Sequence, residues 1–273
     1  MQATISLLNT LLPMLYALAA LVYLVDFFRE DELAARMTRP FLGLVVSVHA
    51  LYLILRTGLY EHIPLASLFE VMTTVAFAVS AVYFYVELRT KTHKTGIFLI
   101  TFSFIFQTIS SAFISNTGNF PDILRSPLFG VHTVSAVLGY TAFAVSAIYG
   151  VLYLLLYHDL KSSRFGIVYR RLPSLDLLAM MSLRAAVLGL VFLTATIALG
   201  ALWASQRFPG FYRDPKFVMT LIVWAVYAGG IGLHYQLGWT GRRSIYISLF
   251  GFALIVFSVM AARLWFQSFH GFA

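Results

Sequence analysis

Cysteine is absent from the 273-residue chain. Its absence excludes disulfide bonds, thiolate metal sites and thiol redox chemistry supplied by the chain itself. Charge is also scarce, because 11% of the residues are charged, against about 25% in an ordinary soluble domain. A chain that is 60% hydrophobic is neither a soluble globular domain nor a disordered one. The composition therefore predicts a protein of the lipid bilayer.

Long apolar windows follow one another along the whole chain. A helix that spans a bilayer needs about 20 mostly apolar residues, and the sequence contains eight such windows. We therefore expect an all-α, polytopic integral membrane bundle of eight transmembrane helices, forming a single domain over residues 1–273. The first window is too long for the apolar core of a cleavable signal peptide and is expected to stay. The windows cover residues 7–28, 41–59, 64–86, 96–115, 128–157, 183–206, 217–237 and 244–266.

Basic residues are unevenly distributed around these windows. Thirteen of the 19 Lys and Arg residues lie in or beside the loops that follow the first, third, fifth and seventh windows. Cytoplasmic loops hold the excess of Lys and Arg, so both termini are expected on the outer side of a bacterial cytoplasmic membrane. The net charge of +8 is scattered between apolar runs. Because a nucleic-acid reader gathers its cations on one face, no nucleic-acid partner is expected.

Several kinds of enzyme lack their usual residues in this sequence. We find no Ser/His/Asp arrangement, no glycine-rich phosphate loop and no His-x-x-x-His pair. Glu70 is the acidic residue that stands apart, because it is predicted to lie two turns into the third window. An ionisable group at that depth is a candidate functional residue. A structural ion pair with Arg56 is an equally good interpretation.

Two histidines and one aromatic loop are predicted to share the outer face. His132 opens the fifth window, His270 follows the eighth, and the loop 203–216 reads WASQRFPGFYRDPK. Imidazoles for iron, rings for a porphyrin and cations for propionates are the components of a haem pocket. Zinc would need further compact ligands, of which this face offers only His62. The ordinary alternative is an interfacial aromatic belt. The loop residues concerned are Trp203, Phe208, Phe211 and Tyr212, with the cations Arg207, Arg213 and Lys216.

His49 and His234 form a second candidate pair inside the membrane. Counted from the nearest inner-loop arginines at about 1.5 Å per residue, their depths differ by only about 3 Å. The two histidines could share a ligand, or each could hydrogen-bond a neighbouring helix, which is the commoner use of a buried histidine. His93 and His158 lie in the basic inner loops and are expected to be solvated.

Residues 48–70, VHALYLILRTGLYEHIPLASLFE, resemble the early segment of CcsA-type cytochrome c assembly proteins. In that family a histidine-bearing helix leads into a Pro-Leu signature that ends in Glu, here Glu70. The similarity extends from about Phe41 to the C-terminus. Divergent HemX- or YpjD-like proteins are also similar to the chain. The further segments that carry the resemblance are VHTVSAVLGYTAF with His132, GALWAS with Trp203, DPK from Asp214 to Lys216, LIVWAVYA before His234, GWTGRR at 238–243 and GFALIVFSV at 251–259.

The resemblance implies a System II haem-handling subunit that presents non-covalently bound haem b on the outer face for attachment to apocytochrome c. His132 and His270 would be axial ligands there, and His49 and His234 would hold haem in transit. Glu70 would either stabilise the structure or tune the haem site. It also implies a separate CcsB-type partner and a subunit of a cytochrome c synthetase without a nucleophile of its own. The propionates would meet Arg125, Arg207, Arg213 or Lys216, beside an aromatic floor that includes Trp203.

One departure from the family pattern concerns the aromatic loop. The family's loop is rich in tryptophan and ends in Trp-Asp, whereas Phe208, Phe211, Tyr212 and Arg213 occupy that region here. Phenylalanine and tyrosine still stack on a porphyrin, so altered haem binding is expected. Two alternatives stay open. One is a small-molecule transporter, suggested by Glu70 and the glycines at 229, 230 and 232, and the other is a regulator of haem biosynthesis that binds an enzyme through the basic loop 161–171.

Overall fold

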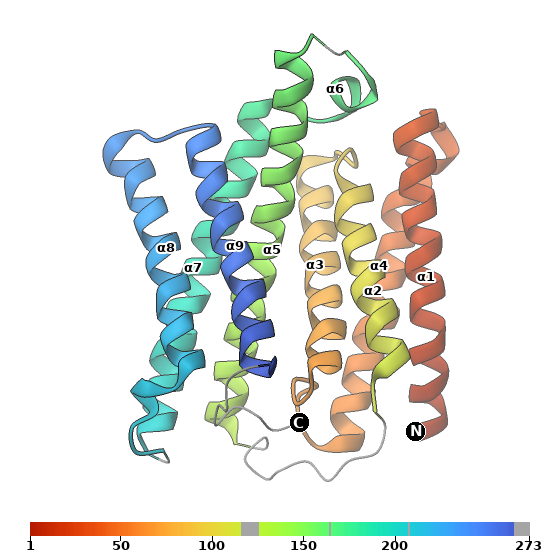
Figure 1. Cartoon of the computed structure of the whole chain (residues 1–273). Coiled ribbons are helices and arrows are strands. Elements are labelled where there is room, and N and C mark those ends of the chain that lie inside the picture. Colours follow the sequence, from red (N-terminus) through yellow and green to blue (C-terminus); the bar gives the residue numbers. More distant parts are fainter. Residues whose placement is uncertain (116–125, 164, 207, 265–273) are drawn as a thin grey trace. The chain divides into compact units, whose positions relative to one another are not determined.

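Eight helices in the described part of the chain are long and apolar enough to cross a membrane (Figure 1). The computed structural model describes residues 1–115, 126–163, 165–206 and 208–264, with side chains as far as residue 260. No strand occurs among these residues. The eight helices confirm the eight predicted windows. In chain order the elements are α1 (Gln2–Arg29), α2 (Glu32–Tyr60), α3 (Leu68–Thr90), α4 (Gly96–Phe113), α5 (Pro127–Lys161), α6 (Ile167–Arg171), α7 (Leu175–Ser205), the 3-10 turn η2 (Phe211–Arg213), α8 (Pro215–Leu237) and α9 (Arg242–Leu264).

Side-chain acceptors and glycine determine where several helices begin and end. The carboxylate of Asp31 accepts a hydrogen bond from the amide of Ala34 at 2.8 Å and starts α2. Asp214 accepts from two amides in the first turn of α8. Such caps satisfy the amide groups that a helix start leaves without partners. α8 ends at Leu237 and is capped by Gly238, whose φ of 64° lies in the left-handed region that glycine adopts without strain.

The third helix begins later than the sequence predicted. The expected span starts at residue 64, but α3 starts at Leu68, because Pro64 lies in the preceding loop and Ser67 caps the helix. The Ser67 hydroxyl accepts from the amide of Glu70 at 3.2 Å. Glu70 therefore lies in the first turn of α3. The prediction that it lies two turns into a membrane span is wrong.

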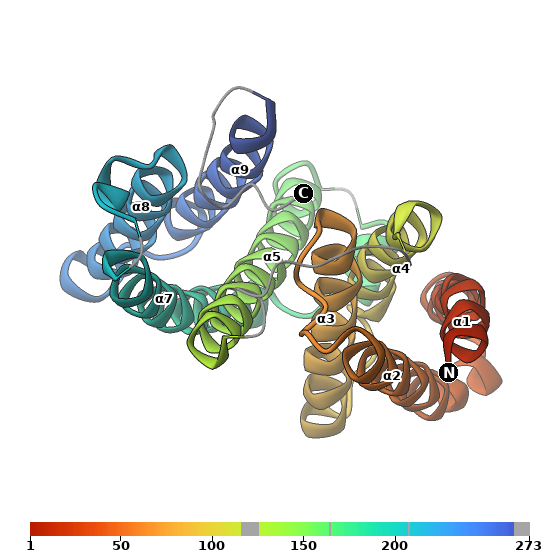
Figure 2. The same ribbon diagram turned by 90° about the horizontal axis from the view of Figure 1, so that it is seen from below.

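The chain divides into two compact units of four long helices each. Unit 1 consists of Met1–Arg125 with Arg170–Leu172, and unit 2 of Ser126–Tyr169 with Pro173–Ala273. In unit 1, α1 and α3 each pack against both α2 and α4, so the four helices form a closed ring. In unit 2, α5 and α8 each pack against both α7 and α9, and Figure 2 shows each set in end view. A single domain over residues 1–273 stays a prediction, as does the outer position of both termini.

The core of unit 2 contains a close aromatic stack between α5 and α8. The rings of Phe143 and Tyr227 lie 3.8 Å apart, at an interplanar angle of 17°. A Cβ atom placed on Gly189 would lie 2.6 Å from the Phe143 ring, and one on Gly251 would lie 2.6 Å from the Tyr227 ring. Small residues thus let α7 and α9 approach the stack closely, which is the usual way in which membrane helices associate.

Candidate functional site

His132 lies near the N-terminal end of α5, where the sequence predicted it. Its Nδ1 atom is 2.9 Å from the backbone carbonyl oxygen of Thr196 on α7. A carbonyl oxygen can only accept a hydrogen bond, so Nδ1 carries the proton of the neutral ring and the lone pair is on Nε2. An imidazole whose second nitrogen is held in this way is the form that binds metals in proteins. The side chain is therefore prepared to act as a ligand through Nε2.

Three aromatic rings extend from His132 in a continuous series. The centroid of Phe129 lies 6.3 Å from that of His132 and 5.3 Å from that of Trp203. The centroid of Phe208 is 5.6 Å from that of Trp203. We call these four residues, Phe129, His132, Trp203 and Phe208, the His132 cluster. Sequence analysis missed Phe129, although it lies three residues before His132 and thus on the same face of α5.

The remaining aromatic residues of the loop lie beyond this cluster. Phe211 packs against Phe217, with ring centroids 5.4 Å apart, and against Tyr212 at 6.0 Å. The guanidinium of Arg213 lies over the Tyr212 ring, 5.6 Å from its centroid. Tyr212 is 57% exposed, and η2, which carries these residues, contacts both α7 and α8. The loop therefore presents an accessible aromatic and basic surface at this end of unit 2.

Asp214 and Lys216 lie together at the start of α8 but differ in their contacts. The Asp214 carboxylate is buried and accepts from the amides of Lys216 at 2.9 Å and Phe217 at 3.2 Å. It thereby fixes the first turn of α8. Lys216, in the same turn, is half-buried. Three predicted site residues lie outside the described residues, namely His270, Arg207 and Arg125.

His49 lies in the interior of unit 1 with both ring nitrogens hydrogen-bonded. The hydroxyl of Tyr16 on α1 is 2.9 Å from Nδ1, and Oγ1 of Thr73 on α3 is 2.9 Å from Nε2. Thr73 donates its own proton to Oε1 of Gln107 on α4, at 2.7 Å. Nε2 must therefore donate to Thr73, and Nδ1 must accept from Tyr16. One residue from each helix joins this chain, which we call the unit 1 polar chain (Tyr16, His49, Thr73, Gln107).

His234 lies in unit 2, in the last turn of α8. Its Nδ1 donates to the carbonyl oxygen of Trp239 at 2.7 Å, and the hydroxyl of Ser244 donates to the same oxygen at 2.8 Å. The lone pair of His234 is therefore on Nε2, as in His132. His49 and His234 belong to different units. A haem shared by these two histidines stays a prediction.

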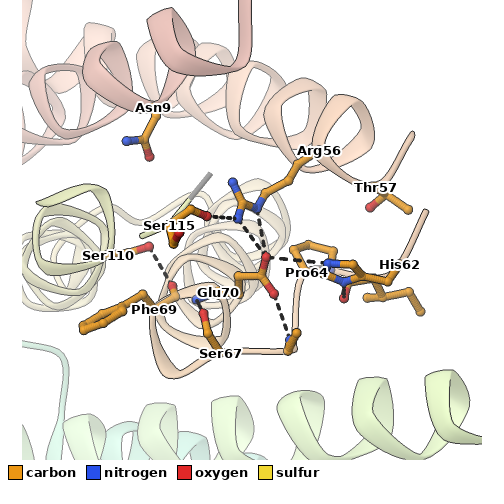
Figure 3. A network of polar contacts seen from close by, with 12 residues as sticks. Asn9, Arg56, Thr57, His62, Pro64, Ser67, Phe69, Glu70, Ser110 and Ser115 are labelled. Atoms are coloured by element: carbon orange, nitrogen blue, oxygen red, sulfur yellow. Dashed lines mark hydrogen bonds and ion pairs between the residues drawn. The ribbon is translucent and has the colours of Figure 1, made fainter. Parts of the chain in front are cut away.

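Glu70 is the centre of a buried polar network at one end of unit 1 (Figure 3). Its Oε1 accepts from Nε of Arg56 at 3.1 Å and from Nη2 at 2.8 Å, and its Oε2 accepts from the amide of Ala66 at 2.8 Å. Arg56 also donates to the carbonyl of Ser115 at 2.9 Å, while Nε2 of His62 lies 4.0 Å from Oε1. The side chains of Arg56 and Glu70 are 1% and 0% exposed. Of the two interpretations of Glu70, the structure contains the ion pair.

Two further buried carboxylates, Asp26 and Glu87, were missed by sequence analysis. Glu87 is 1% exposed and accepts hydrogen bonds from Thr38, at 3.1 Å, and from Tyr23. Asp26 is 4% exposed and lies 3.3 Å from Nε2 of His93. The expectation of a solvated His93 is wrong, since its side chain is 32% exposed and paired with this carboxylate. Both acids lie within a turn of a helix end, where a sequence pattern indicates solvent.

The His132 cluster suits a haem group better than a bare metal ion. Among the described residues, no group of three or more His, Cys, Asp or Glu side chains could hold a metal. The porphyrin of haem supplies four nitrogen ligands to the iron. A protein site therefore needs to supply only one or two further ligands and an apolar lining. The cluster combines one imidazole lone pair with three aromatic rings, which are groups that hold haem in proteins.

Comparison with known proteins identifies a matching family and several similar proteins. The model of the family described as Cytochrome C assembly protein matches residues 41–270, so α1 lies outside the match. The chain is 28% identical to Protein HemX of Brevibacillus brevis over 223 residues, covering 78% of this chain and 79% of that protein. It is 24% identical to the cytochrome c biogenesis protein CcsA of Heterosigma akashiwo over 243 residues (75% and 74%). For CcsA of Chlorella vulgaris the identity is 26% over 258 residues, 81% of each chain.

Proposed function

Because the chain belongs to the cytochrome c assembly protein family, we propose that it is a haem-handling membrane protein of cytochrome c biogenesis. Non-covalent haem b is held at the His132 cluster, on the outer face of a bacterial cytoplasmic membrane, and presented to apocytochrome c. A CcsB-type protein is the proposed membrane partner. The observation that carries the proposal is the hydrogen bond from His132 to the Thr196 carbonyl, which leaves the lone pair of His132 on Nε2.

The residues of the cluster have separate roles in this proposal. His132 offers Nε2 to the iron, and His270, outside the described residues, is the proposed second ligand. Trp203 and Phe208 supply apolar rings for the porphyrin face, and Lys216 supplies a positive charge for a propionate. Haem itself brings the redox-active iron and the vinyl groups to which acceptor thiols add. The chain therefore needs no nucleophile, and its residues orient the ligand and exclude water.

The proposed transit histidines start from different hydrogen-bonding states. His234 keeps its lone pair on Nε2, so it is already in the form that binds iron. His49 accepts from Tyr16 and donates to Thr73, so it can bind iron only after one of these hydrogen bonds is released. We propose that His49 is the ligand whose availability depends on a rearrangement inside unit 1.

Absorption spectroscopy of the purified full-length protein tests the proposal. The protein is prepared from haem-replete cells, and its oxidised and reduced spectra are recorded for the wild type, His132→Ala and His158→Ala. His158 is an exposed histidine on the same helix and serves as the matched control. We expect a six-coordinate haem in the wild type and the control, and a five-coordinate or absent haem in His132→Ala. A wild type without haem, even after reconstitution, would contradict the proposal.

A regulator of haem biosynthesis is the second candidate, favoured by the similarity to Protein HemX. The predicted docking loop 161–171 is only partly available for a partner, because Arg171 donates to the carbonyl of Phe27 at 2.8 Å. Lys161 and Arg170 remain exposed. A regulator of this kind would lose its function when Lys161 and Arg170 are neutralised and would keep it in His132→Ala. The haem-handling role predicts the opposite pattern.

A transporter receives less support from the geometry of α8. A transporter site is commonly formed by a helix that breaks near the middle of the membrane. α8 is continuous from Pro215 to Leu237 and passes through all three candidate glycines, Gly229, Gly230 and Gly232. Gly230 serves close packing, since a Cβ atom there would lie 2.3 Å from Ile247. We therefore do not favour transport of another small molecule.

A further inference from the structure

Gly200 lies on α7 directly against the ring of His132. A Cβ atom placed on Gly200 would lie 2.6 Å from Cε1 and 2.9 Å from Nδ1 of that ring. Real Cβ atoms essentially never approach another heavy atom to less than 3.0 Å. The observed position of the His132 ring is therefore compatible only with a residue that has no side chain.

The backbone of Gly200 does not itself require glycine. The residue lies inside the continuous helix α7 and does not belong to the glycines with positive φ. In a helix interior, glycine is less favourable than alanine because it loses more conformational freedom on folding. The contact with His132 is the feature of this structure that explains a glycine at this position.

The spacing between Gly200 and Thr196 explains why the contact matters for the hydrogen bond. Gly200 follows Thr196 by four residues, which is about one helical turn. The Cα–Cβ bond of a helical residue tilts towards the N-terminus, so a side chain at position 200 would cover the turn that contains the Thr196 carbonyl. The missing side chain leaves this carbonyl open to Nδ1 of His132, which approaches it to 2.9 Å.

We propose that Gly200 is a positioning residue for the iron ligand His132: it opens the Thr196 carbonyl, and this bond fixes both the orientation of the ring and its Nδ1–H tautomer. The inference rests on the proposed haem-handling function. In Gly200→Ala the ring yields before the helix does, because turning a side chain is easier than shifting a backbone. The ring then loses its partner and no longer directs the Nε2 lone pair to one place. Loss of the hydrogen bond that orients a metal-binding histidine weakens metal binding by about 10- to 100-fold.

The test compares the full-length wild type with Gly200→Ala and Gly229→Ala. Gly229 is a helical glycine of the same unit with nothing within 4 Å of an added Cβ, so it is the matched control. The first measurement uses haem-free protein and records the ring nitrogen shifts of 15N-labelled histidine, with His132 assigned through His132→Ala. We expect a single Nδ1–H tautomer in the wild type and in Gly229→Ala, and a mixture in Gly200→Ala. The second measurement titrates each protein with haem and follows its absorption spectrum.

Each outcome separates the positioning role from the proposed function. Weaker haem binding by about 10-fold or more in Gly200→Ala, together with the mixed tautomer, supports the positioning role. Wild-type tautomer and affinity in Gly200→Ala overturn that role, while the haem-handling function stands if His132→Ala loses its haem. A wild type that binds no haem overturns the function, and the positioning role with it.

A double-mutant cycle covers the case in which Gly200→Ala folds but is too unstable for the haem titration. The steric conflict is with the His132 ring, so Gly200→Ala should destabilise the wild type but not a His132→Ala background. The midpoint of thermal unfolding in detergent is measured for all four proteins. The same loss of stability in both backgrounds would show that position 200 acts through another contact and would overturn the proposal.

Discussion

The hydroxyl of Tyr16 on α1 donates a 2.9 Å hydrogen bond to Nδ1 of His49 on α2, in the closed ring of helices that forms unit 1. Both residues are 0% exposed. Because the Nε2–H group of His49 donates to Thr73, Tyr16 is the donor that completes the hydrogen bonding of the imidazole ring. The state of His49, a proposed transit ligand, thus depends on a residue of the first helix.

Replacing Tyr16 by Phe should destabilise the protein. The change leaves the Nδ1 lone pair of His49 buried without its donor, which typically lowers the free energy of unfolding by about 1–3 kcal/mol. Thermal unfolding in detergent measures the effect. Tyr85→Phe, at a residue that is 57% exposed, is the control and should leave the midpoint unchanged. Equal midpoints for both variants would show that the hydrogen bond contributes nothing to stability.

The Arg56–Glu70 pair should be much more sensitive to loss of charge. Glu70→Gln keeps the shape of the side chain but leaves the guanidinium of Arg56 buried without its counter-charge. We expect a loss of about 3–5 kcal/mol in unfolding free energy, as for other buried pairs with one partner removed. The exposed pair of Glu32 and Arg36 supplies the control, and Glu32→Gln should have little effect.

Removing both charges together should restore part of that loss. The double variant Arg56→Leu with Glu70→Leu places no unpaired charge inside unit 1, so it should be more stable than Glu70→Gln alone. Chemical unfolding of the three proteins compares them. A double variant less stable than Glu70→Gln would mean that the hydrogen bonds to Ala66 and Ser115, rather than the charge pair, stabilise this end of the unit.

Enlarging one ring of the exposed loop should improve haem binding, if the proposed function is right. Tyr212 is 57% exposed, so tryptophan fits there without disturbing the packing. An added aromatic contact contributes about 0.5–1.5 kcal/mol, which corresponds to about 2- to 10-fold tighter binding of haem to Tyr212→Trp. Spectroscopic titration measures it. Tyr85→Trp, on α3 and likewise 57% exposed in the wild type, is the control and should bind haem as the wild type does.

Two adjacent arginines of α6 should differ in their effect on the loop that contains them. Arg171 donates to the carbonyl of Phe27 at 2.8 Å and lies 3.4 Å from Glu30, whereas Arg170 is exposed. Arg171→Ala should therefore accelerate amide hydrogen exchange over residues 166–174, because it releases the loop from the end of α1. Arg170→Ala should not. Equal exchange in the two variants would argue against Arg171 as the anchor.

The sequence predicts the helices well because each one must carry an apolar stretch long enough to cross a bilayer. The ends are less predictable, since hydropathy does not detect caps or charged turns. α2 starts at Glu32 instead of residue 41, because its first turns carry Arg36 and Arg39 and are invisible to an apolar window. α3 starts at Leu68 because Ser67, and not the apolar run, fixes its first turn.

The candidate site was predictable only where it depends on neighbouring residues in the sequence. His132 and the aromatic loop are visible as residue types in a local pattern. The carbonyl of Thr196 and the space at Gly200 are not, because they depend on how α5 packs against α7. The unit 1 polar chain was hidden for the same reason, since each of its four residues comes from a different helix.

The first helix supplies hydrogen-bond partners that the region matched by the family model does not contain. The family match begins at residue 41, yet α1 places Asn9, Tyr16 and Tyr23 seven residues apart, on one face. They hydrogen-bond the Ser111 carbonyl, His49 and Glu87 respectively. A graft of residues 41–270 onto a foreign first helix would leave His49, Glu87 and the Ser111 carbonyl without these partners. Such a chimera should be more stable when the donor helix carries hydrogen-bonding side chains at the same two-turn intervals.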